Sequence, residues 1–312
     1  MLNYKISGSG KVKLVLLHGF MENLSIWGDM EKKLSPDFTL IKIDLPGHGL
    51  SKVYGESHSM EFMAKEVLKV TESLNLKHFH LLGHSMGGYV SLAFAEKFPE
   101  LPESITLFFS TYYADDAEKK AQREKSLKII KENFPTYVNA GIPNLFNANE
   151  KDILEGKINE AKEIALSTKN EGVLAAVKGM IGRTDKSSVL ENFEGKILVL
   201  AGKHDTAVNS EKTLKNLPEK TNIKSYLLDC GHNGHWEKPA VCAEVINTEL
   251  LHNLPKKFVF KFSSFLQKAP LTDTVLHEKR WSFDHLSYYK KQLLIRLFDV
   301  TASKSLHFLL FL

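Results

Sequence analysis

The run at residues 83–87, GHSMG, is the stretch of this sequence best suited to nucleophilic chemistry. An apolar run precedes it at 78–82, and residues 88–98 carry apolar side chains at helical spacing. A G-x-S-x-G motif at a strand-to-helix turn holds the serine hydroxyl above the sheet edge, where the helix N-terminus favours negative charge. Glycine is needed two positions either side of Ser85, because larger side chains would clash in so sharp a turn. We therefore interpret Ser85 as a nucleophile rather than as a serine in an ordinary loop.

A serine nucleophile needs a base and an acid that orients the base. Asp205 and His232 each stand four residues after an apolar strand pattern, which ends at Ala201 and Leu228 respectively. In an open α/β sheet such loops meet at one edge, so both are expected beside Ser85. His232 would accept the Ser85 proton and Asp205 would hold the ring tautomer. Asp229 is the nearest alternative acid, but it stands too close to His232 along the chain to reach around the ring easily.

Two backbone N–H groups are expected to form the oxyanion hole, those of Phe20 and Met86. Phe20 follows His18-Gly19 at the end of the first core strand, and Gly19 permits a close approach of that backbone. The alternative is that His18-Gly19 is only a turn. His84 and His235 are candidates for contacting substrate; His84 is otherwise expected to support the surrounding loops, and His235 to pack or hydrogen-bond near the site.

Two other classes of function remain open. Cys230, His232 and His235 have a spacing that could bind zinc, but no fourth ligand is evident and the triad explains His232 better, so we expect no metal and no cofactor. The second is a catalytically silent binding protein on a hydrolase scaffold. The presence of every catalytic position argues against it.

The elements around these residues alternate between apolar strands and amphipathic helices. Strands are predicted at 13–17, 39–43, 104–110, 196–202 and 223–228, and helices at 26–34, 60–74 and 240–252. This alternation predicts an α/β fold with a parallel sheet covered on both faces. Residues 112–188 lack strong strand signals, so we expect a helical insertion there, a lid over the carboxyl edge of the sheet. It is punctuated by Pro135, Gly141, Pro143, Gly156, Gly172 and Gly182.

Five motifs in this order resemble the α/β-hydrolase superfamily: HGF at 18–20, DLPGHGLS at 44–51, GHSMGG at 83–88, GKHD at 202–205 and GHNGHWEKP at 231–239. The resemblance covers residues 1 to about 253. It implies an eight-stranded, mostly parallel sheet whose first strand is near 2–6, and it places a cap at the insertion. The expected organisation is a hydrolase core at 1–111 and 189–254, a helical cap at 112–188, and an extension at 255–312.

A serine at the motif centre favours acyl transfer, since relatives that cleave carbon–halogen bonds or epoxides use aspartate. The sequence is similar to esterases, to cofactor-free haloperoxidase-like esterases, and to the synthase of 2-succinyl-6-hydroxy-cyclohexadiene carboxylate. We expect a serine hydrolase of a small carboxylic ester or thioester, with a lyase or synthase using the same triad as the alternative. Arg123 and Arg183 are the only arginines before residue 280. Either could hold a substrate carboxylate, although a solvated helix face explains them more simply.

Charge is unevenly distributed along the chain. Residues 256–312 hold ten Lys or Arg against four Asp or Glu, so the first 255 residues hold 31 against 33. A near-neutral body gives no reason to expect nucleic acid as a partner. Two cysteines, no apparent signal peptide and no long apolar run lead us to expect a cytoplasmic enzyme without a transmembrane segment. The basic, aromatic tail is an appendage packed on the body, a segment for a membrane surface or another subunit, or a stretch unrelated to the fold, which we favour.

Overall fold

A seven-stranded sheet forms the centre of the computed structural model, which describes residues 1–34 and 36–251. The extension predicted at 255–312, and the end of the helix predicted to reach His252, lie outside the described residues. The strand order is β1-β3-β2-β4-β5-β6-β7. The strands are β1 (Tyr4–Ser7), β2 (Val12–Leu17), β3 (Phe38–Ile43), β4 (Phe79–His84), β5 (Pro102–Phe108), β6 (Lys196–Gly202) and β7 (Ile223–Leu228).

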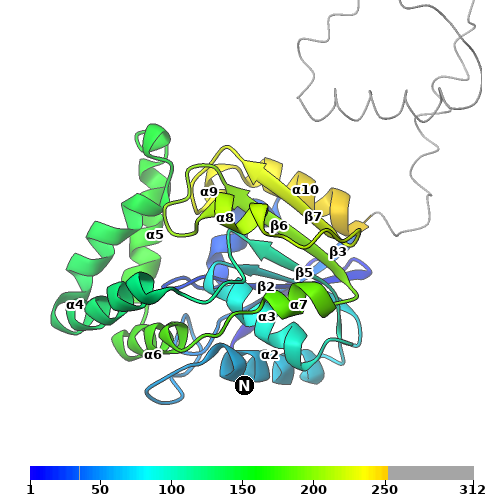
Figure 1. Ribbon diagram of the computed structural model, residues 1–312, viewed down its shortest axis with the longest axis horizontal. Coiled ribbons are helices and arrows are strands. Elements are labelled where there is room, and N and C mark those ends of the chain that lie inside the picture. Colours follow the sequence, from blue (N-terminus) through cyan, green and yellow to red (C-terminus); the bar gives the residue numbers. More distant parts are fainter. Residues whose placement is uncertain (35, 252–312) are drawn as a thin grey trace, which may run out of the picture. The chain divides into compact units, whose positions relative to one another are not determined.

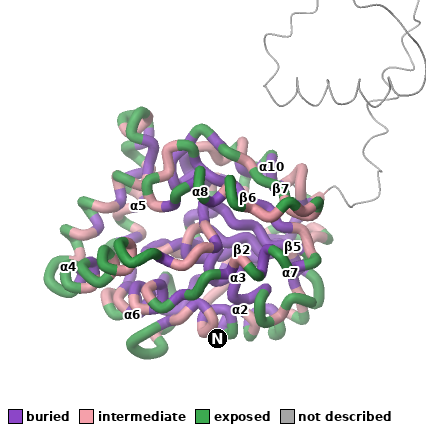
Figure 2. Tube along the Cα trace, viewed as in Figure 1, coloured by how far each residue is buried: buried purple, intermediate pink, exposed green. Residues whose placement is uncertain are grey.

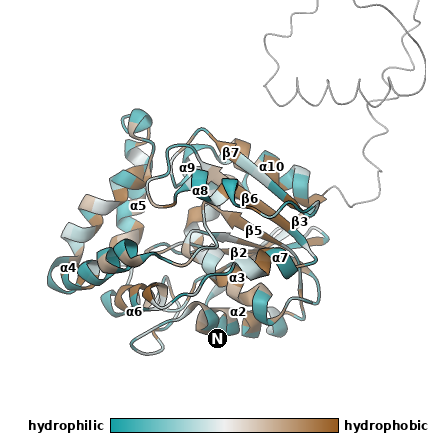
Figure 3. Cartoon of the chain, viewed as in Figure 1, coloured by the Kyte–Doolittle hydropathy of each residue, from teal (hydrophilic) through white to brown (hydrophobic). Residues whose placement is uncertain are grey.

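All neighbouring strands are parallel except β1, which pairs antiparallel with β3. The mostly parallel α/β sheet is confirmed, but eight strands were expected and the described residues form seven. The strand implied near 2–6 is present as β1. The middle residues of β2, β4, β5 and β6 are buried and mostly apolar, as a sheet covered on both faces requires (Figure 2 and Figure 3).

Helices cover the sheet in two groups (Figure 1). In one, α2 (Met60–Ser73) packs on α3 (Met86–Lys97), which contacts α7 (Ser187–Asn192). In the other, α1 (Gly28–Glu31), α9 (Gly234–Glu237) and α10 (Pro239–Leu251) pack together. The short α8 (Ser210–Lys215) contacts β6. Ser59 caps α2 by accepting the Phe62 N–H, and the apolar side of α2 is buried at 60, 63, 64, 67 and 70, as its spacing predicts.

The segment between β5 and β6 contains α4 (Ala117–Gly141), α5 (Glu155–Ser167) and α6 (Asn170–Ile181), where the helical insertion was predicted. These helices lie together beside the sheet, at the left in Figure 1. Short 3-10 turns, η2 (Ile142–Leu145) and η3 (Ala148–Glu150), join α4 to α5, and another, η1 (Leu24–Trp27), precedes α1. At Asn133 the backbone of α4 leaves helical geometry, and the Asn133 side chain accepts the Thr136 N–H beside Pro135.

Two glycines predicted to interrupt the insertion lie inside helices instead. Gly156 belongs to α5 and Gly172 to α6. A Cβ on Gly172 would lie 2.1 Å from the Gly47 carbonyl oxygen, so this glycine allows α6 to approach the loop after β3. No helix in the described part of the chain is long and apolar enough to cross a membrane.

Candidate active site

Ser85 stands at the turn between β4 and α3 with φ 48° and ψ −112°. This left-handed conformation is costly for a residue with a Cβ, and it lifts the side chain out of the strand. A Cβ on Gly83 would lie 2.2 Å from the backbone of Gly87, and a Cβ on Gly87 would lie 2.5 Å from the Leu17 carbonyl oxygen. Both glycines are therefore required for the turn to close against β2.

Asp205 and His232 are in contact: His232 Nδ1 lies 2.7 Å from Asp205 Oδ2. Asp205 follows β6 and His232 follows β7, so the parallel strands bring together loops that are 27 residues apart. The other carboxylate oxygen accepts the N–H groups of Ala207 and Val208 at 2.8 and 2.9 Å, which fixes the carboxylate plane. Asp229 instead pairs with His204, 2.9 Å away at the surface.

This contact determines the chemistry available to His232. Burial alone would lower the pKa of His232, but the Asp205 carboxylate outweighs burial and raises it above its usual value. With Nδ1–H donating to Asp205, the neutral ring has its lone pair on Nε2. Within residues 1–34 and 36–251, no hydrogen bond joins Ser85 to His232, but both line the same cavity of about 190 Å³. Bonds of this kind are often long before substrate binds.

We call this space the site cavity. Phe20, Ser85 and His232 line it from the sheet edge, and side chains of the helical insertion line the opposite wall. The insertion supplies, among others, Lys119, Arg123, Tyr137, Ile142, Leu145 and Met180. The cavity is thus formed jointly by the strand-end loops and by the segment predicted to be a cap.

The peptide between Gly19 and Phe20 is held in one orientation. His18 Nε2 accepts the Leu45 N–H at 2.9 Å, so Nδ1 carries the hydrogen and donates to the Gly19 carbonyl oxygen at 2.7 Å. In a trans peptide the N–H of Phe20 points to the opposite side from that carbonyl. Met86 is the first residue of α3, so its N–H has no partner within the helix. The predicted oxyanion donors are therefore two backbone groups beside Ser85 and the site cavity.

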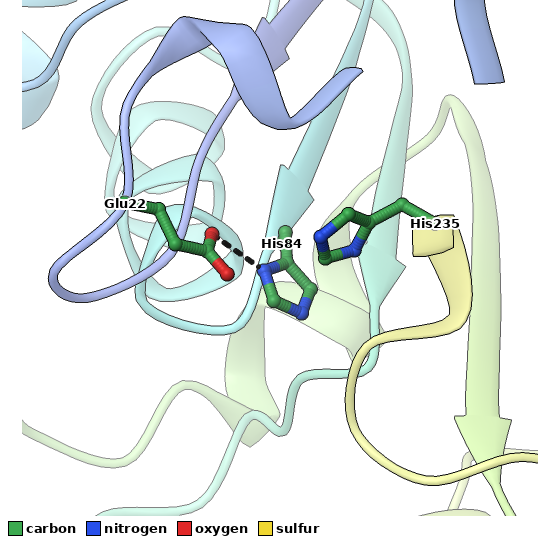
Figure 4. A group of neighbouring side chains, drawn as sticks. All are labelled: Glu22, His84 and His235. Atoms are coloured by element: carbon green, nitrogen blue, oxygen red, sulfur yellow. Dashed lines mark hydrogen bonds and ion pairs between the residues drawn. The ribbon is translucent and has the colours of Figure 1, made fainter. Parts of the chain in front are cut away.

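His84 and His235 lie close together with Glu22, which sequence patterns did not single out (Figure 4). Glu22 lines the site cavity. His84 lines the cavity but is only 1% exposed, and it hydrogen-bonds Glu22 and the backbone of His232. His235 does not line the cavity. It packs among aromatic rings, its nitrogens have no hydrogen-bond partner among the described residues, and burial lowers its pKa well below the usual value. This environment leaves His235 neutral and gives it no route to substrate.

Two combinations of side chains have ligand chemistry for a metal. Glu22, His84 and His235 bring one ligand atom each within 4.8 Å of the others, but Glu22 and His84 are already bonded to each other. Cys230, of the zinc alternative, is fully buried, and burial raises the pKa of its thiol, which disfavours the thiolate that zinc binds. Neither combination offers a set of free ligands.

The two arginines have different surroundings although they share one carboxylate. Arg183 is 6% exposed; it donates to Asp115 and to the Tyr113 carbonyl and lies 4.0 Å from the centre of the Tyr89 ring. Arg123 Nε donates to the other Asp115 oxygen at 2.6 Å, and its side chain lines the site cavity. Of the two candidates for a substrate carboxylate, only Arg123 reaches the cavity of Ser85.

A second carboxylate that the sequence did not reveal, Glu237, anchors the loop of His232. It accepts the N–H groups of Gly231, Asn233 and Asn147 at 2.8, 3.1 and 3.0 Å. Asn147 belongs to the insertion, and the His232 N–H also donates to Leu145 of the insertion at 2.8 Å. Glu237 therefore connects the loop of His232 with the segment that forms one wall of the site cavity.

We expect Glu237→Ala to lower the free energy of unfolding by about 3 kcal/mol or more, because three buried donors lose their acceptor. For a domain of this size, that corresponds to a Tm roughly 6–12 °C lower, measurable by calorimetry. Glu66→Ala is the matched control: Glu66 is also buried but contacts an exposed lysine on its own helix, so its effect on Tm is expected to be smaller. Equal losses of Tm in both variants would contradict this assignment.

Comparison with known proteins agrees with this architecture. Residues 13–156 match the family model described as alpha/beta hydrolase fold. A thermophilic esterase from Thermogutta terrifontis has a similar structure, with a TM-score of 0.75 and 28% identity over 80% of this chain and 93% of that chain. An enol-lactonase from Burkholderia xenovorans is similar in fold, with a TM-score of 0.74 and 20% identity over 80% of this chain and 96% of that chain.

Curated relatives match in sequence over different lengths. A serine hydrolase-like protein from Danio rerio is 36% identical over 96 residues, which are 30% of this chain and 29% of that protein. The matched part thus spans about three tenths of the length of such relatives. Monoacylglycerol lipase abhd6-B from Xenopus laevis is 27% identical over 78% of this chain and 76% of its own length. Taken with the sheet order and the turn at Ser85, these similarities show that the chain belongs to the α/β-hydrolase superfamily.

Proposed function

We propose that this hydrolase cleaves small carboxylic esters through an acyl-enzyme on Ser85. The observation that carries the proposal is the cavity shared by Ser85 and His232, with Asp205 hydrogen-bonded to the far side of the His232 ring. A hydroxyl, a base and an orienting carboxylate are the groups that acyl transfer by a serine requires. The esterase and lipase among the similar proteins support the same reaction class.

The chemical steps follow from these positions. Ser85 Oγ attacks the ester carbonyl carbon while His232 Nε2 takes the hydroxyl proton. The carbonyl oxygen becomes an oxyanion, which accepts hydrogen bonds from the N–H groups of Phe20 and Met86. When the carbon–oxygen bond to the alcohol breaks, His232 returns the proton to the leaving alcohol. Water then attacks the acyl-enzyme by the same sequence, releasing the acid and restoring Ser85.

The size of the site cavity limits the acyl group. Its volume of about 190 Å³ is below the roughly 300–1,000 Å³ usual for drug-sized ligands. We therefore expect activity on a series of p-nitrophenyl esters to be greatest for short acyl chains and to fall as the chain lengthens. Stoichiometric labelling by a fluorophosphonate, with the adduct located on Ser85 by peptide mass spectrometry, tests the proposal directly. An adduct on another residue, or no adduct, would refute it.

Arg123 adds a preference for an acidic group in the substrate. Burial would lower the pKa of Arg123, but Tyr89 and Asp115 outweigh burial and raise it, so the guanidinium remains charged beside the cavity. Asp115 accepts from Nε of Arg123, and a guanidinium has four further N–H donors. A carboxylate on the substrate can pair with these donors, which would be a charge-assisted contact.

For Arg123→Met we expect kcat/KM on esters carrying a free carboxylate to fall by about 10- to 100-fold, because a hydrogen bond to a charged group contributes about 1.5–3 kcal/mol. On neutral esters of the same length kcat/KM should change little. Arg183→Met is the comparison, since Arg183 pairs with the same Asp115 without lining the site cavity; it should lower Tm and leave the ratio between the two esters unchanged. If Arg123→Met lowered kcat/KM equally on the two kinds of ester, Arg123 would not bind a substrate carboxylate.

A further inference from the structure

Glu22 and His84 form a buried pair next to the proposed nucleophile, and both line the site cavity. Glu22 is 9% exposed and His84 is 1% exposed, and Glu22 Oε2 lies 2.9 Å from His84 Nδ1 (Figure 4). His84 is the last residue of β4 and the chain neighbour of Ser85. The pair thus comes from two segments that are 62 residues apart.

The pair contacts two parts of the proposed catalytic machinery and adjoins the third, Ser85, along the chain. Glu22 Oε2 also accepts the N–H of Gly19 at 2.5 Å, in the loop that carries Phe20. His84 Nε2 lies 3.1 Å from the carbonyl oxygen of His232. A Cβ on Gly19 would lie 2.7 Å from Glu22 and 2.8 Å from His84, so the loop fits against the pair only with glycine there.

The partners of His84 determine where its protons lie. A carbonyl oxygen only accepts, so Nε2 carries a hydrogen toward His232. Burial would raise the pKa of Glu22, but the charge and hydrogen bond of His84 outweigh burial and lower that pKa to about 2. Glu22 is therefore an ionised acceptor, and its Oε2 lies within hydrogen-bond distance of His84 Nδ1. Each ring nitrogen of His84 thus faces a group that only accepts, the Glu22 carboxylate on one side and the His232 carbonyl on the other.

We propose that Glu22 is a positioning residue for the reaction: through His84 and Gly19 it holds the oxyanion loop, the nucleophile and the loop of the base in one arrangement. The inference rests on the proposed function. Glu22 donates no proton to substrate in this role. It fixes the peptide before Gly19, as His18 fixes the peptide after it, and it fixes the ring that contacts the backbone of His232.

If Glu22 has this positioning role, replacing it should weaken stabilisation of the transition state and change substrate binding little. In Glu22→Gln the group that faces the His84 ring and the Gly19 N–H loses its negative charge, and the amide NH2 introduces donors where the carboxylate only accepts. On p-nitrophenyl acetate we expect kcat to fall by about 100-fold, the size of losing one oxyanion donor, with KM within about threefold. The affinity for phenylboronic acid, whose adduct with serine is tetrahedral, should fall by a similar factor. Glu66→Gln, a buried carboxylate outside the site cavity, should change none of these values.

A second variant tests the same role in case Glu22→Gln does not fold. His84→Asn removes the contact with the His232 carbonyl while leaving the Gly19 bond to Glu22, and it should show the same split between kcat and KM. In the double variant the two losses should not add, because both residues act through one network. The inference is overturned if kcat of either variant stays within twofold, or if KM rises while boronate affinity is kept. Ser85→Ala, measured in parallel, distinguishes failure of this inference from failure of the proposed function. If Ser85→Ala is still labelled by a fluorophosphonate, the proposed function itself is refuted.

Discussion

Replacing Ser85 with alanine is expected to lower kcat by about 10⁶-fold and to abolish fluorophosphonate labelling. Without the hydroxyl no acyl-enzyme forms, and the remaining activity comes only from substrate binding and the oxyanion donors. The substitution removes one oxygen atom and keeps the Cβ, so the turn between Gly83 and Gly87 remains closed. The Tm should therefore stay close to that of the unmodified protein, which separates loss of chemistry from loss of fold.

Ser91 provides the matched control for this experiment. It lies on α3, six residues after Ser85, is fully buried, and donates to the Gly87 carbonyl oxygen at 2.9 Å. Ser91→Ala should retain labelling and most of the activity, because this hydroxyl does not line the site cavity. If labelling survived in Ser85→Ala and were lost in Ser91→Ala, the nucleophile would have been assigned to the wrong serine.

The parts of the fold that could be predicted were those with a strong local signal. Short runs rich in apolar residues and bounded by turns predicted β2, β3, β6 and β7 to within one residue at each end. The loops after β4, β6 and β7 could then be assigned to one edge, because parallel strands share their carboxyl ends. In the structure Asp205 and His232 are hydrogen-bonded, and His232 shares a cavity with Ser85. Their catalytic roles stay predictions.

Contacts made by buried side chains that follow no strand-end or periodic pattern could not be predicted in this way. Glu22 and Glu237 bind backbone N–H groups, and a buried carboxylate of this kind has no periodic pattern. Gly172 looked like a helix breaker because sequence shows its conformational freedom but not the Gly47 carbonyl against it. In the sequence, Arg123 and Arg183 are equivalent candidates for binding a substrate carboxylate, whereas in the structure both pair with Asp115. Each of these residues acquires its role from a partner that only the folded chain supplies.

Asp205→Asn is expected to have the second largest effect, lowering kcat by about 10⁴-fold while leaving Ser85 in place. An asparagine amide facing Nδ1 can donate to the ring, which favours the tautomer whose Nε2 carries hydrogen and cannot accept the Ser85 proton. Ala207 and Val208 can still donate to the side-chain oxygen, so the loop should keep its conformation. The tautomer and charge of His232 would then be the properties that change.

The pH dependence of kcat/KM tests whether Asp205 raises the pKa of His232. The base must be neutral, and Asp205 holds the pKa of His232 above the usual 6.5, so activity should rise with pH through a value above 6.5. In Asp205→Asn the largest effect that raises this pKa is lost while the opposing effect of burial remains, so the acid limb should move to lower pH. Because the folded-state pKa of His232 is raised, protonation of His232 adds to the free energy of unfolding at pH values below about 6.5. This added stability is lost as the pH rises through the folded-state pKa of His232, and it should be absent in Asp205→Asn. Asp229→Asn is the control, because it removes an exposed carboxylate that pairs with His204. It should leave kcat and the acid limb of the pH profile unchanged. If the acid limb moved in Asp229→Asn and not in Asp205→Asn, Asp229 would be the acid that orients His232.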